Sequence, residues 1–391
     1  MVAITRRQAT FGITSVAALG AVPARAAEVV KVGLILPMTG PFASTGKQID
    51  AAVRLYMQQH GDSVAGRKIE VVLKDDGNVP DVTKRLAQEL VVNQHVAVLA
   101  GFGLTPLALA AAPIATQAKV PEVVMAAATS TITEASPFIV RTSEALPQTV
   151  APFAEWLHRN GVKSIVTLVS DYGPGHDAET WIKGPFEKAG GKVLATLRVP
   201  LANPDFAPFL QRAADARPEA IFIFVPSGAG AAVMKQFAER GLDKAGIRLV
   251  GTGDVLDDDI LNGMGDVVLG VVTSQHYSAA HDSALNREFV AAFQKANPGM
   301  RPNFMAVGGY DGMALIYKAL ENTGGDADGT KLIAAMKGMA WESPRGPISI
   351  DPATRDIIQN DYIRRAEKRD GQIWNIEFDT IPAVKDPAKA G

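Results

Sequence analysis

Two threonines stand where a predicted strand gives way to a predicted helix, and their hydroxyls could hold an anion. Thr105 follows the glycine-rich turn 101–104 and precedes Pro106, and Thr129 lies in the small-residue stretch 126–130. A polar residue followed by proline is typical of a helix start, where backbone N–H groups are free. Such N–H groups attract anions, so the hydroxyls beside them could bind a ligand carboxylate. The alternative, that both threonines are plain helix caps, stays open at this point.

Three glycine-rich turns resemble nucleotide-binding loops, but each lacks a required residue. The turn at 40–48 has one residue too many for a phosphate loop and carries Gln48 where Mg²⁺ needs Ser or Thr. The turns that begin at Gly101 and Gly251 start like a dinucleotide fingerprint, but the third glycine is missing from both. The sequence therefore predicts no nucleotide cofactor.

The residue types of common catalytic sites are absent or wrongly spaced. The sequence has no cysteine and no Gly-x-Ser-x-Gly motif, and its six histidines form no i,i+4 pair. The run Asp257–Asp259 lacks calcium-loop spacing and is better explained as acids that open a helix, and Asp75–Asp76 as a solvated turn. We therefore expect no catalytic residue, no metal site and no cofactor, and a protein that is not an enzyme.

A repeated strand–helix pattern must position these turns. The stretch 29–36 is apolar at nearly every residue, which indicates a strand buried on both faces. Further strands are expected near 69, 97, 123 and 138–141, with helices at 46–59, 82–93 and 107–117. After a break at Leu146–Pro147, strands start at 165, 193, 221 and 249, each 28 residues after the last, with helices at 180–189, 206–216 and 228–240. Two such series predict an α/β protein with two doubly wound lobes on parallel sheets.

The rest of the chain is less regular. The segment 276–282 is polar and without periodicity, and helices are predicted at 286–297 and 304–321. Short strands follow at 348–350, 361–365 and 374–378, and the tail after Phe378 is expected to be a loose terminus. We expect the chain to return to the first lobe after the polar segment. The predicted division is 27–145 plus 277–352 for lobe 1, and 146–276 plus 353–391 for lobe 2.

The N-terminus resembles an export signal. Arg6 and Arg7 precede an apolar run that is too short to span a bilayer, and the small-x-small site Ala24–Ala26 follows. This pattern predicts a signal peptide over 1–26, cleaved near Ala27, and a periplasmic protein. The paired arginines indicate the twin-arginine route, with an ordinary Sec signal as the alternative.

Composition limits what the mature chain can bind. Removal of Arg6, Arg7 and Arg25 lowers the 39 basic residues to 36 against 41 acidic ones, a net charge of −5. No run of five like charges occurs, which argues against nucleic acid and against a membrane surface as partners. About 365 mature residues are too many for one core, so we expect two domains in a soluble monomer.

Several motifs together resemble the leucine/isoleucine/valine-type periplasmic binding proteins of ABC importers. They are VGLILPMTGP at 32–41, DD at 75–76, Gly101, ATS at 128–130, RT at 141–142, DYGPG at 171–175 and RGP at 345–347. Their order and spacing cover nearly the whole mature chain. The resemblance implies the type I periplasmic-binding fold, in which two Rossmann-like lobes joined by a three-crossing hinge close on a ligand. It also implies a small-molecule carboxylate as ligand and a membrane permease as partner.

The resemblance also implies a set of ligand-binding residues. Thr105 and Thr129 match the hydroxyls that hold the ligand carboxylate, Ala127 matches a backbone contact, and Leu104 belongs to the same loop as Thr105. Tyr172 matches an aromatic residue of the second lobe that covers the ligand.

Three positions depart from the pattern of that family. Thr45 stands where an aromatic residue is usual, with Phe42 nearby as an apolar replacement. Amino-acid binders place a carboxylate for the α-ammonium at the position of Gly253, whereas here the acid follows as Asp254, and they tend to carry an aromatic residue where Ser227 stands. A buried ammonium without an acceptor costs several kcal/mol, and Gly253 and Ser227 are expected to enlarge the pocket. These departures favour a small organic acid, including aromatic acids. A branched-chain or other amino acid, and a ligand-sensing role in place of import, stay open.

Overall fold

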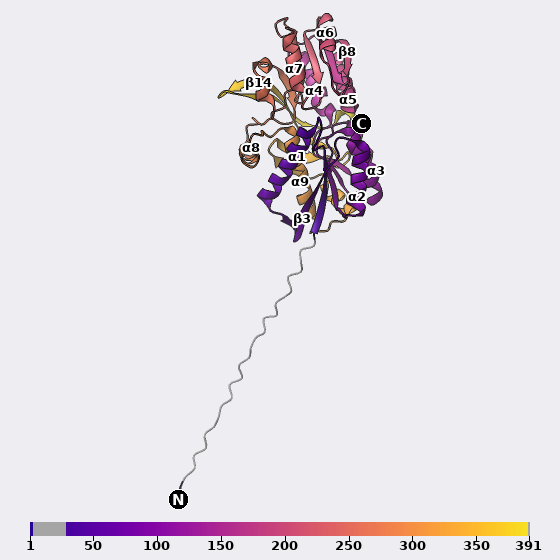
Figure 1. Ribbon diagram of the computed structural model, residues 1–391, viewed down its shortest axis with the longest axis vertical. Helices are drawn as coiled ribbons and strands as arrows, with labels where there is room; N and C mark the ends of the chain where they lie inside the picture. Colours follow the sequence, from indigo (N-terminus) through magenta and orange to yellow (C-terminus); the bar gives the residue numbers. More distant parts are fainter. Residues whose placement is uncertain (3–28, 390–391) are drawn as a thin grey trace.

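The computed structural model describes residues 1–2 and 29–389, so the predicted signal peptide and its cleavage site lie outside the described residues except for Met1 and Val2. The described chain forms two bodies, one above the other in Figure 1. Within the described residues, no helix is both long and apolar enough to cross a membrane.

The first lobe is a six-stranded sheet in the order β2-β3-β1-β4-β5-β6. Its strands are β1 (Val29–Leu36), β2 (Ser63–Val64), β3 (Arg67–Asp75), β4 (Val98–Gly101), β5 (Glu122–Val124) and β6 (Ile139–Arg141). All pairs are parallel except β2 with β3. The helices of this lobe are α1 (Ala43–His60), α2 (Pro80–Val92), α3 (Thr105–Ala118), α8 (Ala284–Ala296), α9 (Phe304–Asn322) and α10 (Gly329–Met336). The chain thus returns to the first lobe after the second, as expected.

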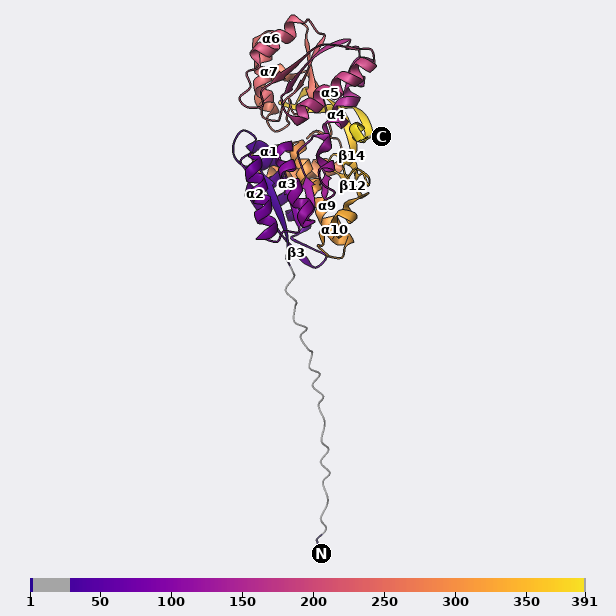
Figure 2. The ribbon, with the colours of Figure 1, turned by 90° about the vertical axis from the view of Figure 1, so that its right-hand side faces the viewer.

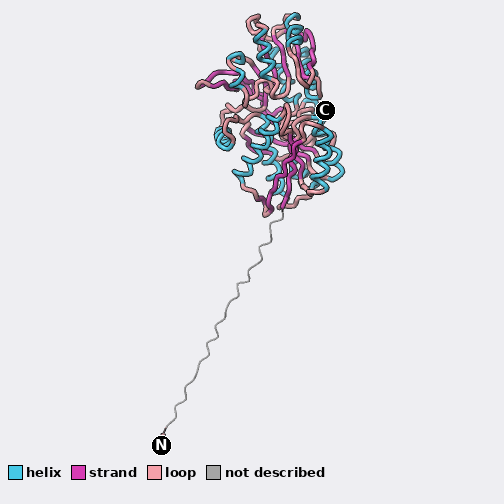
Figure 3. The backbone as a smooth tube through the Cα atoms, viewed as in Figure 1, coloured by secondary structure: helices cyan, strands magenta, loops and turns pink. Residues whose placement is uncertain are grey.

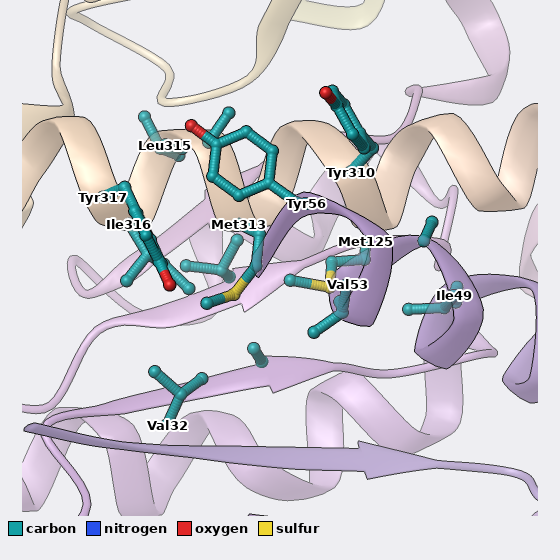
Figure 4. Close-up of a cluster of buried hydrophobic side chains, with 14 of the residues drawn as sticks. Val32, Ile49, Val53, Tyr56, Met125, Tyr310, Met313, Leu315, Ile316 and Tyr317 are labelled. Carbon is teal, nitrogen blue, oxygen red and sulfur yellow. The ribbon is translucent and has the colours of Figure 1, made fainter. Parts of the chain in front are cut away.

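Strand β1 shows why the first sheet is covered on both sides. Val32 and Leu34 belong to the core that α1 and α9 complete, whereas Ile35 packs in a second cluster with α2 and α3. Figure 4 shows the first of these cores, with Val32 facing the residues of α1 and α9. Burial of alternate residues on opposite faces is what the continuous apolar run predicted.

The second lobe centres on a sheet in the order β12-β13-β14-β11-β10-β9-β7-β8, with β15 paired to β14. Its strands are β7 (Ser164–Ser170), β8 (Lys192–Val199), β9 (Ala220–Phe224), β10 (Arg248–Thr252), β11 (Val272–Gln275), β12 (Ala340–Ser343), β13 (Gly346–Ile350), β14 (Ile357–Arg369) and β15 (Gln372–Val384). The helices α4 (Leu146–Arg159) and α5 (Gly173–Lys188) cover one face. The helices α6 (Ala207–Asp215) and α7 (Gly230–Glu239) cover the other.

The 28-residue period of the second series is confirmed. Strands β7, β8, β9 and β10 begin at Ser164, Lys192, Ala220 and Arg248, each 28 residues after the last. They are parallel and are separated by helices, so the period is one βαβ unit. Figure 3 shows strands flanked by helices in both bodies, the two-lobed α/β arrangement that the sequence predicted.

Three segments connect the lobes, as the family resemblance implied. The first joins β6 to α4 over 142–145, the second follows β11 at 276, and the third leads from β13 into β14. Figure 2 places β14 at the junction. The buried Arg345 donates to the carbonyl of Thr142 in the first crossing and pairs with Asp311 at 2.7 Å. We keep the predicted division of the chain into lobes as a proposal. Strands β12 and β13 join the sheet of the second lobe through β14, but Trp341 and Ile350 pack in the core of the first lobe.

Two local expectations were wrong. Leu146–Pro147 does not break the chain but begins α4, because proline at the second helical position has no N–H to leave unpaired. The tail after Phe378 is not loose: β15 continues to Val384, Ser130 Oγ donates to Asp386, and Lys389 Nζ lies 2.6 Å from Asp356 Oδ2.

The acidic run Asp257–Asp259, predicted to open a helix, and the pair Asp75–Asp76, predicted to be a solvated turn, both have buried members. Asp258 is fully buried and pairs with Arg364 at 3.4 Å, and Asp257 accepts two hydrogen bonds from Asn303. These partners come from distant segments, so tertiary contacts hold the run. A short 3-10 helix, Leu261–Met264, follows it with no side-chain cap at its start. Asp75 is exposed as expected, but Asp76 is buried and accepts from Thr83 Oγ1 of α2 at 2.9 Å.

Candidate functional site

A cavity lies between the lobes, at the carboxyl ends of strands from both sheets. Its interior leaves about 30 Å³ free for the centres of water-sized molecules, so the two lobes enclose it tightly in this arrangement. The edge where parallel strands end is where such sheets bind ligands. The lining residues are Phe42, Thr45, Gly103, Leu104, Thr105, Ala126, Ala127, Ala128, Glu144, Tyr172, Pro174, Phe224, Pro226, Ser227, Asp254 and Met305.

A pair of threonine hydroxyls forms one polar corner of the cavity. Thr105 Oγ1 and Thr129 Oγ1 are 2.9 Å apart and buried, with Thr105 in the first turn of α3. Arg141 fixes the loop behind them, since its guanidinium donates to the carbonyl of Thr129 at 2.8 Å and pairs with Asp356 at 2.6 Å. Neither threonine side chain caps its helix. The hydroxyls therefore face each other at the cleft and are not plain caps.

The two lobes touch beside this corner. A Cβ placed on Gly173, the first residue of α5, would lie 2.8 Å from Thr129 Oγ1, so glycine permits the approach. The backbone N–H of Ser130 donates to Asp177 of α5 at 3.0 Å. The second lobe thus contributes a helix N-terminus to the same corner as the threonine pair.

Ala127 lies in the cavity wall, but its backbone groups are already used. Its N–H donates to the carbonyl of Phe102 at 3.1 Å, and its carbonyl accepts from Arg141 at 3.3 Å. Both backbone groups of Ala127 therefore have protein partners in this arrangement, and its methyl group belongs to the apolar cluster of α2 and α3. Leu104 and Thr45 line the same wall.

Aromatic side chains form a flat wall on the second lobe. Tyr172 stacks on Phe224, with ring centroids 6.1 Å apart and planes inclined by 14°. Both rings line the cavity, together with Phe42 from the first lobe and two prolines, Pro174 and Pro226. Flat apolar faces of this kind suit a planar ligand.

Two acidic side chains form the other polar part of the cavity. Thr252 Oγ1 donates to Asp254 Oδ2 at 2.9 Å, and Thr149 Oγ1 donates to Glu144 Oε2. Burial, and next the charge of Glu144, raise the pKa of Asp254 well above its usual range. Burial also raises the pKa of Glu144, but its contacts with His276 and Thr149 outweigh burial and hold this pKa below the ordinary value. Of the two acids, Glu144 is thus the one that ionises more readily.

Gly253 does not line the cavity. A Cβ at this position would lie 2.1 Å from Arg364 Nη2 and 2.7 Å from Gln275 Cβ, so the space beside it is filled. The expectation that Gly253 enlarges the pocket is therefore wrong. Ser227 does line the cavity, as predicted, and is 4% exposed.

The cavity is lined by eight of the ten predicted ligand-binding residues. Of the other two, Thr129 forms a hydrogen bond with Thr105, which lines the cavity. Sequence reasoning missed Glu144, Phe224 and Met305. Phe224 ends a predicted strand at the sheet edge and could have been found by that position, but Glu144 and Met305 carry no local signal. Within the described residues, no three His, Asp or Glu side chains gather in a way that could hold a metal ion.

The family model described as periplasmic binding protein matches residues 29–372, which include the whole cavity and every strand of both sheets before β15. The chain belongs to the periplasmic binding protein family. Its relatives of this type are solute-binding proteins of ABC transporters, and the family implies export to the periplasm. The predicted type I, two-lobed fold is thereby confirmed.

Individual relatives cover almost the full chain. Leu/Ile/Val-binding protein homolog 6 of Brucella abortus is 47% identical over 366 residues, 92% of this chain and 94% of that protein. A solute-binding protein of an ABC transporter from Rhodopseudomonas palustris BisB5, solved with 3,4-dihydroxybenzoic acid, is 65% identical with a TM-score of 0.91, covering 93% of this chain and 99% of that one. Another from R. palustris, solved with 4-hydroxybenzoate, is 43% identical with a TM-score of 0.90, covering 93% and 100%.

Proposed function

We propose that this protein captures an aromatic carboxylate between its lobes and delivers it to the membrane permease of an ABC importer. The observation that carries the proposal is the Tyr172–Phe224 stack, which lines the same cavity as the hydroxyl of Thr105. The ring of the ligand packs against the stacked side chains, and its carboxylate accepts hydrogen bonds from Thr105 and Thr129. The aromatic acids bound by the two R. palustris proteins support this assignment.

The surroundings of Gly253 argue against an amino acid. The resemblance places an ammonium-binding carboxylate at this position, but here the guanidinium of Arg364 fills the adjacent space. No carboxylate stands at this position, so an ammonium group would lack the counter-ion that the family supplies there. Asp254, the nearest acid in sequence, is held towards its neutral form by burial, which weakens it as a counter-ion.

An amino acid is the second candidate, because the Glu144 carboxylate lines the cavity and could accept from an ammonium group. The Brucella relative is named for leucine, isoleucine and valine. The two candidates differ in whether the ligand needs a positive charge, which a binding assay resolves.

A thermal-shift screen of the mature protein tests the proposal. A ligand present at 100 times its Kd stabilises a fold by about 2.7 kcal/mol. We expect the melting temperature to rise with benzoate-type acids and not with leucine, isoleucine or valine. A rise with the amino acids alone would reject the aromatic carboxylate.

Delivery to a permease and periplasmic processing are tested separately. Deletion of the gene should abolish uptake of the ligand by intact cells, whereas a sensing protein would leave uptake unchanged. N-terminal sequencing of periplasmic protein should give Ala27 or a residue within two of it. We expect the purified protein to be a monomer that binds its ligand without turnover.

A further inference from the structure

We propose that Glu144 and Asp254 recognise hydroxyl groups on the aromatic ring, so that the protein prefers phenolic acids to unsubstituted benzoate. The inference rests on the proposed function, because it assumes that the ligand carboxylate lies at Thr105 and Thr129. To the proposed function it adds the ring hydroxyl as the chemical feature by which the site distinguishes one aromatic acid from another.

The strand order separates the threonine pair from the acids. In the first sheet, Thr105 follows β4 and Glu144 follows β6, with β5 between them. In the second sheet, Gly173, which touches the threonine pair, follows β7, whereas Asp254 follows β10, with β9 between them. Neighbouring strands are about 4.8 Å apart, so the strand order puts Glu144 roughly two spacings from Thr105 and one from Thr129, which follows β5. It puts Asp254 roughly two spacings from Gly173.

The Tyr172–Phe224 stack lies between the threonine pair and the two acids. Phe224 ends β9, the strand between β7 and β10, and Tyr172 stacks on it. A ring that packs on this pair with its carboxylate towards Thr105 points its far edge towards the acids. Ring hydroxyls at that edge meet Glu144 and Asp254.

The acids are suited to a hydroxyl partner. Thr149 donates to one oxygen of Glu144, and Thr252 donates to one oxygen of Asp254. Each carboxyl group has further lone pairs with which to accept a hydrogen bond. The lowered pKa of Glu144 favours its acceptor form, and the raised pKa of Asp254 favours the protonated form, which can donate. A phenol hydroxyl both donates and accepts, so the acids match two adjacent hydroxyls.

Unsubstituted benzoate cannot satisfy this part of the cavity. It would exclude water from Glu144 and supply no donor in exchange. A hydrogen bond to a charged group is worth about 1.5–3 kcal/mol, so benzoate should bind about ten- to a hundred-fold more weakly than 4-hydroxybenzoate.

Calorimetry on the mature protein with four ligands tests this inference. The ligands are benzoate, 4-methoxybenzoate, 4-hydroxybenzoate and 3,4-dihydroxybenzoate. The methoxy compound keeps the oxygen but lacks the proton, so it should bind as weakly as benzoate or more weakly. Equal affinity for benzoate and both phenols would overturn the inference while leaving the proposed function intact. Failure of every aromatic acid to bind would instead reject the proposed function.

Two variants assign the effect to residues. Glu144→Gln keeps an acceptor oxygen but removes the charge, and should reduce the preference for 4-hydroxybenzoate over benzoate about five- to tenfold. Thr105→Val should weaken both ligands alike and leave their ratio unchanged. An unchanged ratio in folded Glu144→Gln would reject the role of Glu144, and if this variant does not fold, the four-ligand comparison in the wild-type protein still decides the inference.

Discussion

Replacement of Thr105 by valine should weaken the binding of every carboxylate ligand while keeping the shape of the site. Valine is nearly isosteric with threonine, so the cavity wall is preserved and the hydroxyl alone is lost. A hydrogen bond from this hydroxyl to a carboxylate is charge-assisted and worth about 1.5–3 kcal/mol. Since about 1.4 kcal/mol corresponds to a tenfold change in Kd, we expect a loss of about ten- to a hundred-fold.

Thr105→Val also has a cost in the free protein. Thr105 Oγ1 lies 2.9 Å from Thr129 Oγ1, so the substitution removes a buried hydrogen bond and lowers the free energy of unfolding by roughly 0.5–1.5 kcal/mol. Thr129→Val breaks the same bond. The effects of the two substitutions on unfolding should therefore not add, and the double variant should be more stable than their sum predicts.

Calorimetric titration with 4-hydroxybenzoate measures the effect on binding, and Thr116→Val is the matched control. Thr116 lies near the far end of the same helix and donates to the carbonyl of Ala112 at 2.8 Å, away from the cavity. Its loss should leave Kd unchanged. Unaltered affinity in Thr105→Val, or equal losses in Thr105→Val and Thr116→Val, would refute the placement of the carboxylate.

Three further predictions concern Asp254, Gly253 and closure. Burial, and next the charge of Glu144, raise the pKa of Asp254, so Asp254 stabilises the fold fully below its unfolded pKa of about 3.9 and this contribution is lost as pH rises. The melting temperature of ligand-free Asp254→Asn, relative to that of wild type, should therefore rise between pH 5 and pH 8. A melting-temperature difference that stays constant over this range would contradict the raised pKa. Gly253→Ala should lower the free energy of unfolding by about 1–3 kcal/mol in a urea titration, because its Cβ would strike Arg364; Gly263→Ala, where nothing lies within 4 Å, is the control. Small-angle scattering should show a smaller radius of gyration after saturation with ligand, since ligand drives closure about the three crossings; an unchanged radius with confirmed binding would count against it.

The repetitive part of the fold could be predicted because it depends on local patterns. The strand starts from Ser164 to Arg248 follow from alternating apolar runs and turns, and the glycine-rich turns mark where those strands end. Position at a strand end then suffices to place Thr105 in the cavity, whereas Tyr172 was expected there from the family resemblance.

The remaining features depend on partners that are distant in the sequence. Glu144 gains its role from the crossing it occupies and from His276, whose Nδ1 lies 3.5 Å from its carboxylate. Asp258 is buried because Arg364 pairs with it. Gly253 was misjudged for the same reason: the missing side chain suggested free space, but a guanidinium from another strand fills that space.

The assembly of lobe 1 from separated segments sets an order for folding. The core beneath α1 is completed by α9, and Tyr56 of α1 packs edge-on against Tyr310 of α9 with centroids 5.0 Å apart. All strands of the first sheet precede residue 142, yet α9, which covers one face of the sheet together with α1, begins at Phe304. A chain that ends at residue 275 would thus have the whole first sheet with that apolar face covered by α1 and not by α9. Since contacts over such sequence distances form slowly, the contiguous units around β7–β10 should fold first and the N-terminal sheet last, and the nascent chain should be most prone to aggregation in between.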